Sequence, residues 1–249
     1  MNKNYLTVGL GLGMLLGAAC GGDDASSSDA TPVIDPGDGG DYTVTLDPAD
    51  FVERIDNPYL PLLPGSTWVY EGESDGEAEH IEVTVLSETR QVLGITATVV
   101  RDTVTVAGEL VEDTWDWYAQ DKDGNVWYLG EDSTEYENGE AVSTAGSWEA
   151  GVDGALPGII MQADPAVEDA YRQEYYEGEA EDLAEVIKTG VTEAVEAGAY
   201  NDLIVTKEWT PLLPEVVEEK YYAKGVGMIL EVAVAGGAGR VELLSFTAP

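Results

Sequence analysis

The chain has 249 residues, of which 49 are acidic and 11 are lysine or arginine, so its formal net charge is −38. A charge this negative excludes nucleic acid as a natural partner, repels anionic lipid headgroups and favours a soluble monomer. It also attracts cations, but it is equally consistent with a saline habitat, so it identifies no ligand.

Residues 1–19 have the pattern of a secretion signal. Lys3 precedes an apolar stretch from Tyr5 to Ala19, which is shorter than the roughly 20 residues that a membrane-spanning helix needs. Small residues follow Leu16 and lead directly to Cys20, the only cysteine of the chain. This Leu-Gly-Ala-Ala-Cys sequence resembles the lipobox of bacterial lipoproteins, with leucine one position further from the cysteine than usual. The resemblance implies cleavage before Cys20 and attachment to a membrane through lipid on its sulfur, and a free secreted protein with an unpaired cysteine is the alternative.

Residues 20–49 contain mainly Gly, Ser, Asp and Pro, with few apolar side chains. A segment of this composition cannot bury enough apolar surface to order itself, so we predict a disordered, acidic tether. Gly21 occupies the position where lipoproteins of enteric type carry an aspartate for retention at the inner membrane. The resemblance therefore implies an extracytoplasmic protein at the outer membrane rather than at the inner membrane.

Residues 50–249 show short alternating runs rich in Val, Thr, Tyr and Trp, interrupted by Gly, Asn or Asp. This pattern predicts an all-β domain, an antiparallel meander that forms a curled sheet or half-barrel. Residues 146–169 lack the alternation and are predicted to be a long loop excursion. Residues 166–187 also fit a helix, although Gly178 favours two strands around Glu177-Gly178. We expect strands near residues 67–73, 79–87, 95–106, 109–119, 125–131, 133–137, 140–145, 170–177, 181–189, 201–209, 216–223, 227–234 and 239–246.

Two turns predict how the central strands pair. Asn138-Gly139 is the preferred pair for a two-residue type I′ hairpin. Asp121–Gly124 suits a three-residue hairpin loop whose glycine is left-handed. The facing pairs that follow are Glu137 with Glu140, Ala119 with Trp127, Tyr118 with Tyr128, Trp117 with Leu129, Asp116 with Gly130, and Trp115 with Glu131.

Several segments carry a resemblance that covers about residues 51 to 246. They read IDNPYLPLLPGSTWVYEG, DWYAQDKDGNVWYLGED, GSWEAGVDGALPGIIM, YRQEYYEGEAED and EKYYAKGVG. They resemble an uncharacterised family of bacterial secreted proteins and lipoproteins. PLLPGSTWVY and KYYAKGVGMILE are also similar to elements of curled antiparallel-sheet lipoproteins, whose half-barrel has a concave face. The resemblance implies a fold, and no activity that transfers to named residues.

The residues give little support for catalysis, and we expect a protein that is not an enzyme. A Ser-His or Cys-His nucleophile needs a histidine as base, and His80 is the only one, in a chain without a Gly-x-Ser-x-Gly elbow. We expect His80 to be a surface strand residue. Zinc sites draw on Cys and His, which are too few here. Paired carboxylates could act as acid and base on a glycan, but among 49 acidic residues pairs arise by chance.

Aromatic residues that flank the Asp121–Gly124 turn are the candidate ligand contacts. Their rings could stack on a small molecule or a sugar, although aromatic side chains on a strand more often belong to the core. These residues are Trp115, Trp117, Tyr118, Trp127 and Tyr128.

No motif requires a cofactor, and calcium is the one metal for which the sequence suggests candidate ligands. Asp121 to Asp132 follow the spacing of an EF-hand loop only superficially, because Val126 stands where that loop needs glycine. A second calcium hypothesis depends on the predicted strand pairing. It places Glu112, Asp116 and Asp132 on one face, where their carboxylates could share a weakly bound calcium ion. Solvated acidic strand residues are the alternative.

Three functions stay open from the sequence. The first is a non-enzymatic, membrane-anchored lipoprotein whose β domain binds a small molecule or an envelope protein. The second is an extracytoplasmic hydrolase that uses carboxylates, with glycans as a candidate substrate, and the third is a structural envelope protein. We expect a pocket with converging carboxylates to favour the hydrolase, and an apolar trough to favour binding.

Overall fold

The computed structural model describes residues 42–74 and 76–249. Cys20, the signal segment 1–19 and the tether up to residue 41 lie outside the described residues. Cleavage before Cys20, its acylation and the disorder of this part of the tether therefore stay predictions. A short 3-10 helix, η1 (Pro48–Asp50), precedes the strands. The strands are β1 (Phe51–Val52), β2 (Thr67–Ser74), β3 (Glu77–Val92), β4 (Ile95–Val106), β5 (Glu109–Asp121), β6 (Val126–Glu137), β7 (Glu140–Ser143), β8 (Trp148–Glu149), β9 (Leu156–Met161), β10 (Ala170–Arg172), β11 (Glu174–Tyr175), β12 (Leu183–Val195), β13 (Gly198–Trp209), β14 (Val217–Ala223), β15 (Gly227–Ala235) and β16 (Gly239–Thr247).

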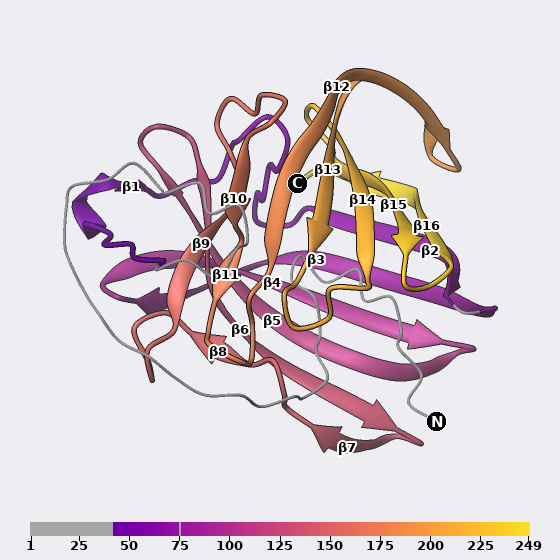
Figure 1. The fold of residues 1–249 in the computed structure, drawn as a ribbon, viewed down its shortest axis with the longest axis horizontal. Helices are drawn as coiled ribbons and strands as arrows, with labels where there is room; N and C mark the ends of the chain where they lie inside the picture. Colours follow the sequence, from indigo (N-terminus) through magenta and orange to yellow (C-terminus); the bar gives the residue numbers. More distant parts are fainter. Residues whose placement is uncertain (1–41, 75) are drawn as a thin grey trace.

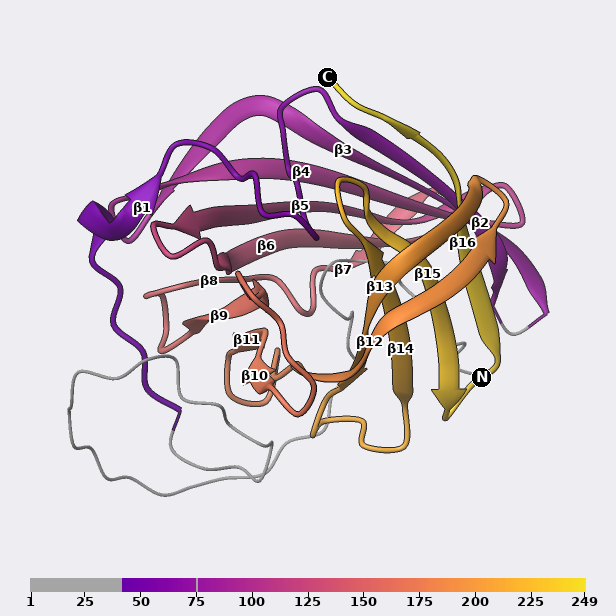
Figure 2. The ribbon, with the colours of Figure 1, turned by 90° about the horizontal axis from the view of Figure 1, so that it is seen from above.

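The strands form one antiparallel sheet that curls until its two ends approach each other. Along the sheet the order is β10-β12-β13-β14-β15-β16-β2-β3-β4-β5-β6-β9-β11, and β1, β7 and β8 pair beside this path. In Figure 1 strands β3–β6 and strands β12–β15 run in clearly different directions. Figure 2 shows these two groups on different sides of the molecule, with β2 and β16 at the bend between them. The predicted all-β fold with a curled antiparallel sheet is confirmed.

The two ends of this strand order are joined by the chain itself. β10 ends at Arg172 and β11 begins at Glu174, so Gln173 alone separates them. β9 approaches this junction at Gly158, where an added Cβ atom would lie 2.3 Å from the carbonyl group of Gln173. Glycine at this position therefore lets the two ends of the sheet come together.

The loop predicted for residues 146–169 is wrong in part. It contains β8 and β9, and both pair with β6. β9 has the sequence Leu-Pro-Gly-Ile-Ile-Met and is buried along most of its length, so it lacks the alternation of a half-exposed strand. Residues 166–187 form β10, β11 and the start of β12, and their described part contains no helix. Tyr176 bridges Ala180 across the turn at Gly178, as the two-strand prediction required.

Close to the two turns, the pairing of the central strands agrees with the prediction. Asn138 and Gly139 have φ angles of 52° and 79°, the left-handed values that a type I′ turn needs. β6 is continuous where the sequence predicts two strands. The predicted pairs that the structure confirms are Glu137 with Glu140, Ala119 with Trp127, and Tyr118 with Tyr128.

Further from the turn, the register of β5 against β6 shifts by one residue. Asp116 faces Glu131 and Trp115 faces Asp132, so the predicted partners of Asp116 and Trp115 are wrong. Because side chains alternate between the faces of a strand, this shift moves Asp132 to the face opposite to the predicted one. Trp117 likewise has no partner on β6, which corrects its predicted pairing with Leu129.

The shift arises at Gly130, where β6 bulges. Gly130 has a φ of 132° and faces Glu149 of β8. A Cβ atom at this position would lie 2.3 Å from the carbonyl oxygen of Trp148. The close approach of β8 therefore requires glycine here, and the extra residue in β6 changes the register of everything beyond it.

The ordered domain begins earlier than residue 50. Tyr42 is buried, and its hydroxyl donates to the carbonyl oxygen of Pro157 at 2.8 Å. Val44 and Leu46 pack against the apolar core. The predicted tether is therefore too long at its C-terminal end. Across 42–74 and 76–249, no helix is both long and apolar enough to cross a membrane.

Candidate ligand site on the inner face of the curled sheet

One face of the curled sheet, here called the inner face, carries buried ionisable side chains. It is the face toward which Asp116 and Tyr118 of β5 point, and strand pairing extends it to the neighbouring strands. Its buried polar residues are Glu79, Asp102, Thr114, Asp116, Glu131, Ser133, Thr206, Glu208, Glu218, Lys220 and Glu231.

Carboxyl groups on strands far apart in the sheet act on one another across the inner face. Burial, together with the negative charges of Glu218 on β14 and Glu112 on β5, raises the pKa of Glu79 on β3 to about 8. Burial also raises the pKa of Asp102 on β4 well above its ordinary value, and Glu231 on β15 is among the negative charges that raise it further. The curl thus brings both halves of the sheet to one acidic interior.

Glu79 is buried, and it lacks a hydrogen-bond partner among the described residues. It is 2% exposed, and neither of its carboxyl oxygens has a hydrogen-bond partner among the described residues. The residues that face it across the sheet are Gly72 on β2 and Val106 on β4, which offer no side-chain donor. Glu79 is therefore an orphaned acid on the inner face.

Asp102 is orphaned in the same way. It is 2% exposed, and both of its carboxyl oxygens lack hydrogen-bond partners within the described part of the chain. Its neighbours across the sheet are Val83 and Thr114. The Thr114 hydroxyl lies 3.0 Å from Glu112 and 2.8 Å from the Ser133 hydroxyl, so its single proton is already committed to one of these two groups.

Lys220 neutralises only part of this acidity. Its ammonium group lies 2.9 Å from Glu208 and 3.6 Å from Glu231, and its side chain is 3% exposed. Thr206 and Tyr222 complete the hydrogen bonds of Glu208. Glu231 is fully buried, and its two carboxyl oxygens have no hydrogen bond within the described residues. Glu231 is thus ion-paired at a distance but still lacks a donor.

A tyrosine links two further inner-face carboxyl groups. Asp116 and Glu131 each place an oxygen 2.7 Å from the hydroxyl oxygen of Tyr128. Burial raises the pKa of Asp116 to about 7, although the hydrogen bond from Tyr128 acts to lower it. Burial also raises the pKa of Glu131, and the charge of Asp116 raises it further.

Sequence reasoning missed the orphaned acids, although a signal for them exists. Asp102 lies in phase with the buried Val100 and Val104, and Glu79 lies in phase with the buried Ile81. A charged residue at the apolar phase of an alternating strand marks a buried charge. The same test does not find Lys220 or Glu231, because Lys220 shares its phase with Glu218 in β14 and apolar residues occupy both phases of β15.

The five aromatic residues predicted as ligand contacts do not gather at one place. Tyr118 and Tyr128 lie on the inner face, where their rings stack with centroids 4.8 Å apart. Trp115, Trp117 and Trp127 lie on the other face. The guanidinium group of Arg101 stacks over Trp115, that of Arg90 stacks over Trp117, and the indole of Trp127 donates to Asp121. Only the two tyrosines therefore adjoin the candidate site.

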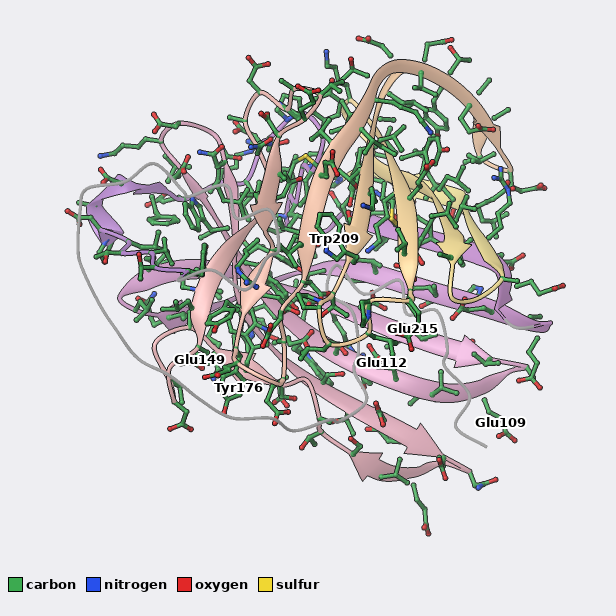
Figure 3. The ribbon with its side chains drawn as sticks, viewed as in Figure 1. Glu109, Glu112, Glu149, Tyr176, Trp209 and Glu215 are labelled. Atoms are coloured by element: carbon green, nitrogen blue, oxygen red, sulfur yellow. The ribbon has the colours of Figure 1, made fainter. Side chains whose placement is uncertain are left out.

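The geometric premise of the calcium hypothesis is wrong. Glu112 and Asp116 share the inner face, but Asp132 faces Trp115 and is exposed on the opposite side. In the part of the chain that the structure describes, no three His, Cys, Asp or Glu side chains are placed to hold a metal ion. In Figure 3 Glu112 lies toward the middle of the view, near the label of Glu215, whereas Glu109 lies at the outer end of the strand.

His80 lies partly exposed on β3, as expected of a surface strand residue. Its ring nitrogens lie 3.6 Å from Glu71 and 3.4 Å from Glu82. Since it neighbours Glu79 in the strand, its side chain points to the face opposite to the inner face. His80 therefore takes no part in the candidate site.

Comparisons with known proteins add little to this description. No family model matches the sequence, and no curated protein matches it. A solved structure of a candidate lipoprotein from Parabacteroides distasonis is 13% identical, and the match covers 77% of this chain and all of that chain with a TM-score of 0.37. A similarity at this level carries no argument about fold or function.

Proposed function

We propose that this chain is a lipid-anchored extracytoplasmic protein that binds a ligand on the inner face of its curled sheet and catalyses no reaction. The observation that carries the proposal is the pair of orphaned acids, Glu79 and Asp102, each 2% exposed and without a hydrogen-bond partner among the described residues. A bound ligand with hydrogen-bond donors would give these carboxyl oxygens the hydrogen bonds that they lack within the described residues.

The physical argument rests on the free energy of buried polar groups. A buried polar group without a hydrogen bond destabilises the folded state by about 1–3 kcal/mol, and a charged group by more. Folded proteins leave few such groups, and those that persist gather at functional sites. Two orphaned acids on neighbouring strands, on which the charge of a third acid, Glu231, also acts, therefore support a binding role for this face.

The membrane anchor rests on the sequence of the N-terminus. The lipobox-like residues Leu16 to Cys20 support acylation of Cys20, and Gly21 in the following position supports the outer membrane. Three acyl chains exceed the two signals that stable anchoring needs. Because the domain is strongly acidic, the lipid rather than a basic surface would hold it at the membrane.

A hydrolase is the alternative function, and converging carboxyl groups would favour it. The best pair is Asp116 and Glu131. One carboxyl oxygen of each lies 2.7 Å from the hydroxyl oxygen of Tyr128, which therefore stands between them. A glycosidase needs its substrate between the two carboxyl groups. Tyr128 occupies that position, and Asp116 is 1% exposed, so this pair suits a closed hydrogen-bonded unit better than an acid-base pair.

Native mass spectrometry of the full mature protein, released from its own host in mild detergent, tests the binding role. We expect a co-purifying small molecule that is lost from the Glu79→Gln, Asp102→Asn variant and kept by Asp132→Asn, which changes the outer face of the same sheet. Both amides match the acids in shape, and thermal melting checks that the variant folds. A wild-type protein without a bound molecule, or a variant that keeps it, would contradict the proposal.

Membrane fractionation tests the anchor separately. Cys20→Ser should move the protein out of the membrane fraction, and density-gradient separation of wild type should place it with the outer membrane. Unchanged membrane association of the Cys20→Ser protein would show that the anchor is elsewhere.

A further inference from the structure

We infer that the ligand of the inner face is an organic cation with ammonium groups, bound between Glu79, Asp102 and Glu231. This inference rests on the proposed function and names the chemical class of its ligand. Three independent features of the site support it: the charge that surrounds the orphaned acids, their missing hydrogen-bond donors and their placement on separate strands.

The charges around the orphaned acids are almost entirely negative. The groups whose charges act on Asp102 are Asp116, Glu112, Glu231 and Glu131, all of them carboxyl groups. Those that act on Glu79 are Glu218 and Glu112. These carboxyl groups repel one another when they are ionised. A neutral ligand would leave that repulsion in place, whereas a cation would relieve it.

For the ionised acids, the missing contacts are hydrogen-bond donors. Each of the three acids has both carboxyl oxygens free of hydrogen bonds within the described residues. Lys220 stands 3.6 Å from Glu231 and is committed to Glu208 at 2.9 Å. An ammonium group carries three N–H donors and a positive charge, so one such group can serve two carboxyl groups at once.

The placement of the acids favours an extended organic cation over a metal ion. Glu79, Asp102 and Glu231 come from β3, β4 and β15, with β16 and β2 lying between β15 and β3 in the sheet. Calcium needs six to eight oxygens at about 2.3–2.6 Å from one point. Within residues 42–74 and 76–249 no three acidic, His or Cys side chains converge in this way. Ammonium groups at the two ends of a short chain can instead reach acids that stand apart.

Protons and the cation would compete for the same carboxyl groups. The raised pKa of Glu79, about 8 because of burial and the charges of Glu218 and Glu112, means that this acid holds a proton near neutral pH. Binding of an ammonium group favours the ionised carboxylate and releases that proton. Affinity should therefore rise as pH increases from about 6 to about 8, while the amine itself stays protonated.

Isothermal titration calorimetry of the full mature protein in detergent tests the class of ligand. The probe is diaminopentane, with pentanediol as its neutral counterpart and calcium chloride as the inorganic cation, all at matched ionic strength. We expect diaminopentane to bind, pentanediol not to bind, and buffers of different ionisation enthalpy to reveal proton release at neutral pH. Glu79→Gln with Asp102→Asn should weaken diaminopentane binding at least tenfold, and Asp132→Asn should leave it unchanged.

Each contrary result overturns the inference in a distinguishable way. If diaminopentane does not bind, or binds the Glu79→Gln, Asp102→Asn variant equally well, the site takes no organic cation. Equal binding of pentanediol would mean a neutral hydroxylated ligand, and calcium binding that the same variant abolishes would mean an inorganic cation. In each of these cases a co-purifying molecule that depends on Glu79 and Asp102 would leave the proposed binding function standing.

Discussion

Asp116 and Glu131 lie opposite each other on β5 and β6, and both contact the hydroxyl oxygen of Tyr128 at 2.7 Å. A tyrosine hydroxyl has one proton to donate, so it can hydrogen-bond to only one of the two carboxylates. The second short contact requires a proton on one carboxyl group, which then donates to the tyrosine oxygen. The arrangement therefore holds one proton between two acids, in agreement with their raised pKa values.

Tyr128→Phe should destabilise the domain by about 2–3 kcal/mol, because it leaves both carboxyl groups without their shared partner in a buried site. Urea unfolding measures the change. Tyr136→Phe is the matched control, since Tyr136 lies on the same strand but is half-buried, and it should change stability by less than about 0.5 kcal/mol. Equal changes in the free energy of unfolding for the two substitutions would mean that the Tyr128 hydroxyl stabilises the domain no more than a half-buried tyrosine hydroxyl does.

Stability should fall as pH rises from about 4 to about 8. A carboxyl group whose pKa is higher in the folded than in the unfolded protein holds its proton more tightly when folded. Its contribution is therefore complete below the unfolded pKa and is lost as pH rises to the folded pKa, which burial raises to about 8 for Glu79 and to about 7 for Asp116 and Glu218. Each such group contributes a slope of up to about −1.4 kcal/mol per pH unit within that window.

Melting temperature measured from about pH 4 to about pH 8 at constant high salt checks this dependence, because salt screens the exposed charges more than the buried ones. Glu79→Gln should flatten the upper part of the curve, and Glu82→Gln, on the exposed side of the same strand, should not. A melting temperature that rises with pH in wild type would show that the inner-face acids are ionised and well paired.

Lys220→Met should destabilise the protein by roughly 3–5 kcal/mol, since it leaves Glu208 and Glu231 buried without a cation. Lys188→Met provides the comparison. Lys188 is 49% exposed and pairs with Glu219 at 3.1 Å on the surface, so its removal should change stability by about 0–1 kcal/mol. Chemical denaturation of both variants measures the two changes in the free energy of unfolding. Similar decreases would show that the ion pair of Lys220 contributes no more than a surface ion pair.

Gly130→Ala should destabilise the domain by more than about 2 kcal/mol, because the new Cβ atom would lie 2.3 Å from the carbonyl oxygen of Trp148 at a φ of 132°. Gly237→Ala tests the general effect of adding a methyl group, since nothing lies within 4 Å of the Cβ position there. That control should change the free energy of unfolding by less than about 0.5 kcal/mol. A tolerated Gly130→Ala would mean that β6 can lose its bulge.

The alternating pattern and the turns predicted most of the fold because both are local. Asn138-Gly139 allows one hairpin geometry, so the facing of Glu137 and Glu140 follows from a few residues. The bulge at Gly130 depends on β8, which pairs with β6 from outside the hairpin. The sequence around Gly130 does not predict this pairing. That single unpredicted residue moved Asp132 to the opposite face and removed the basis of the calcium hypothesis.

The candidate site was harder to predict than the fold because it depends on the curl. The pattern of β4 marks Asp102 as a buried acid, but it does not indicate that the charge of Glu231, from a strand later in the chain, acts on it. In the strand order β16, β2 and β3 lie between β15 and β4, so the interaction depends on the curl of the sheet. Similarly, β9 is apolar on both faces, so its sequence lacks the alternation that identifies a half-exposed strand, and its pairing with β6 is what defines it.

The most direct test of the account is a carbon-13 NMR titration of the carboxyl groups in the mature protein, with the Glu79 signal assigned by comparison with Glu79→Gln. The central claim is that the inner face holds acids that lack partners within the fold. It predicts that Glu79 titrates with a pKa of about 8, because of burial and the charges of Glu218 and Glu112, and that diaminopentane lowers this value. Titration of Glu79 near the ordinary value of 4.5, unchanged by diaminopentane, would contradict the account.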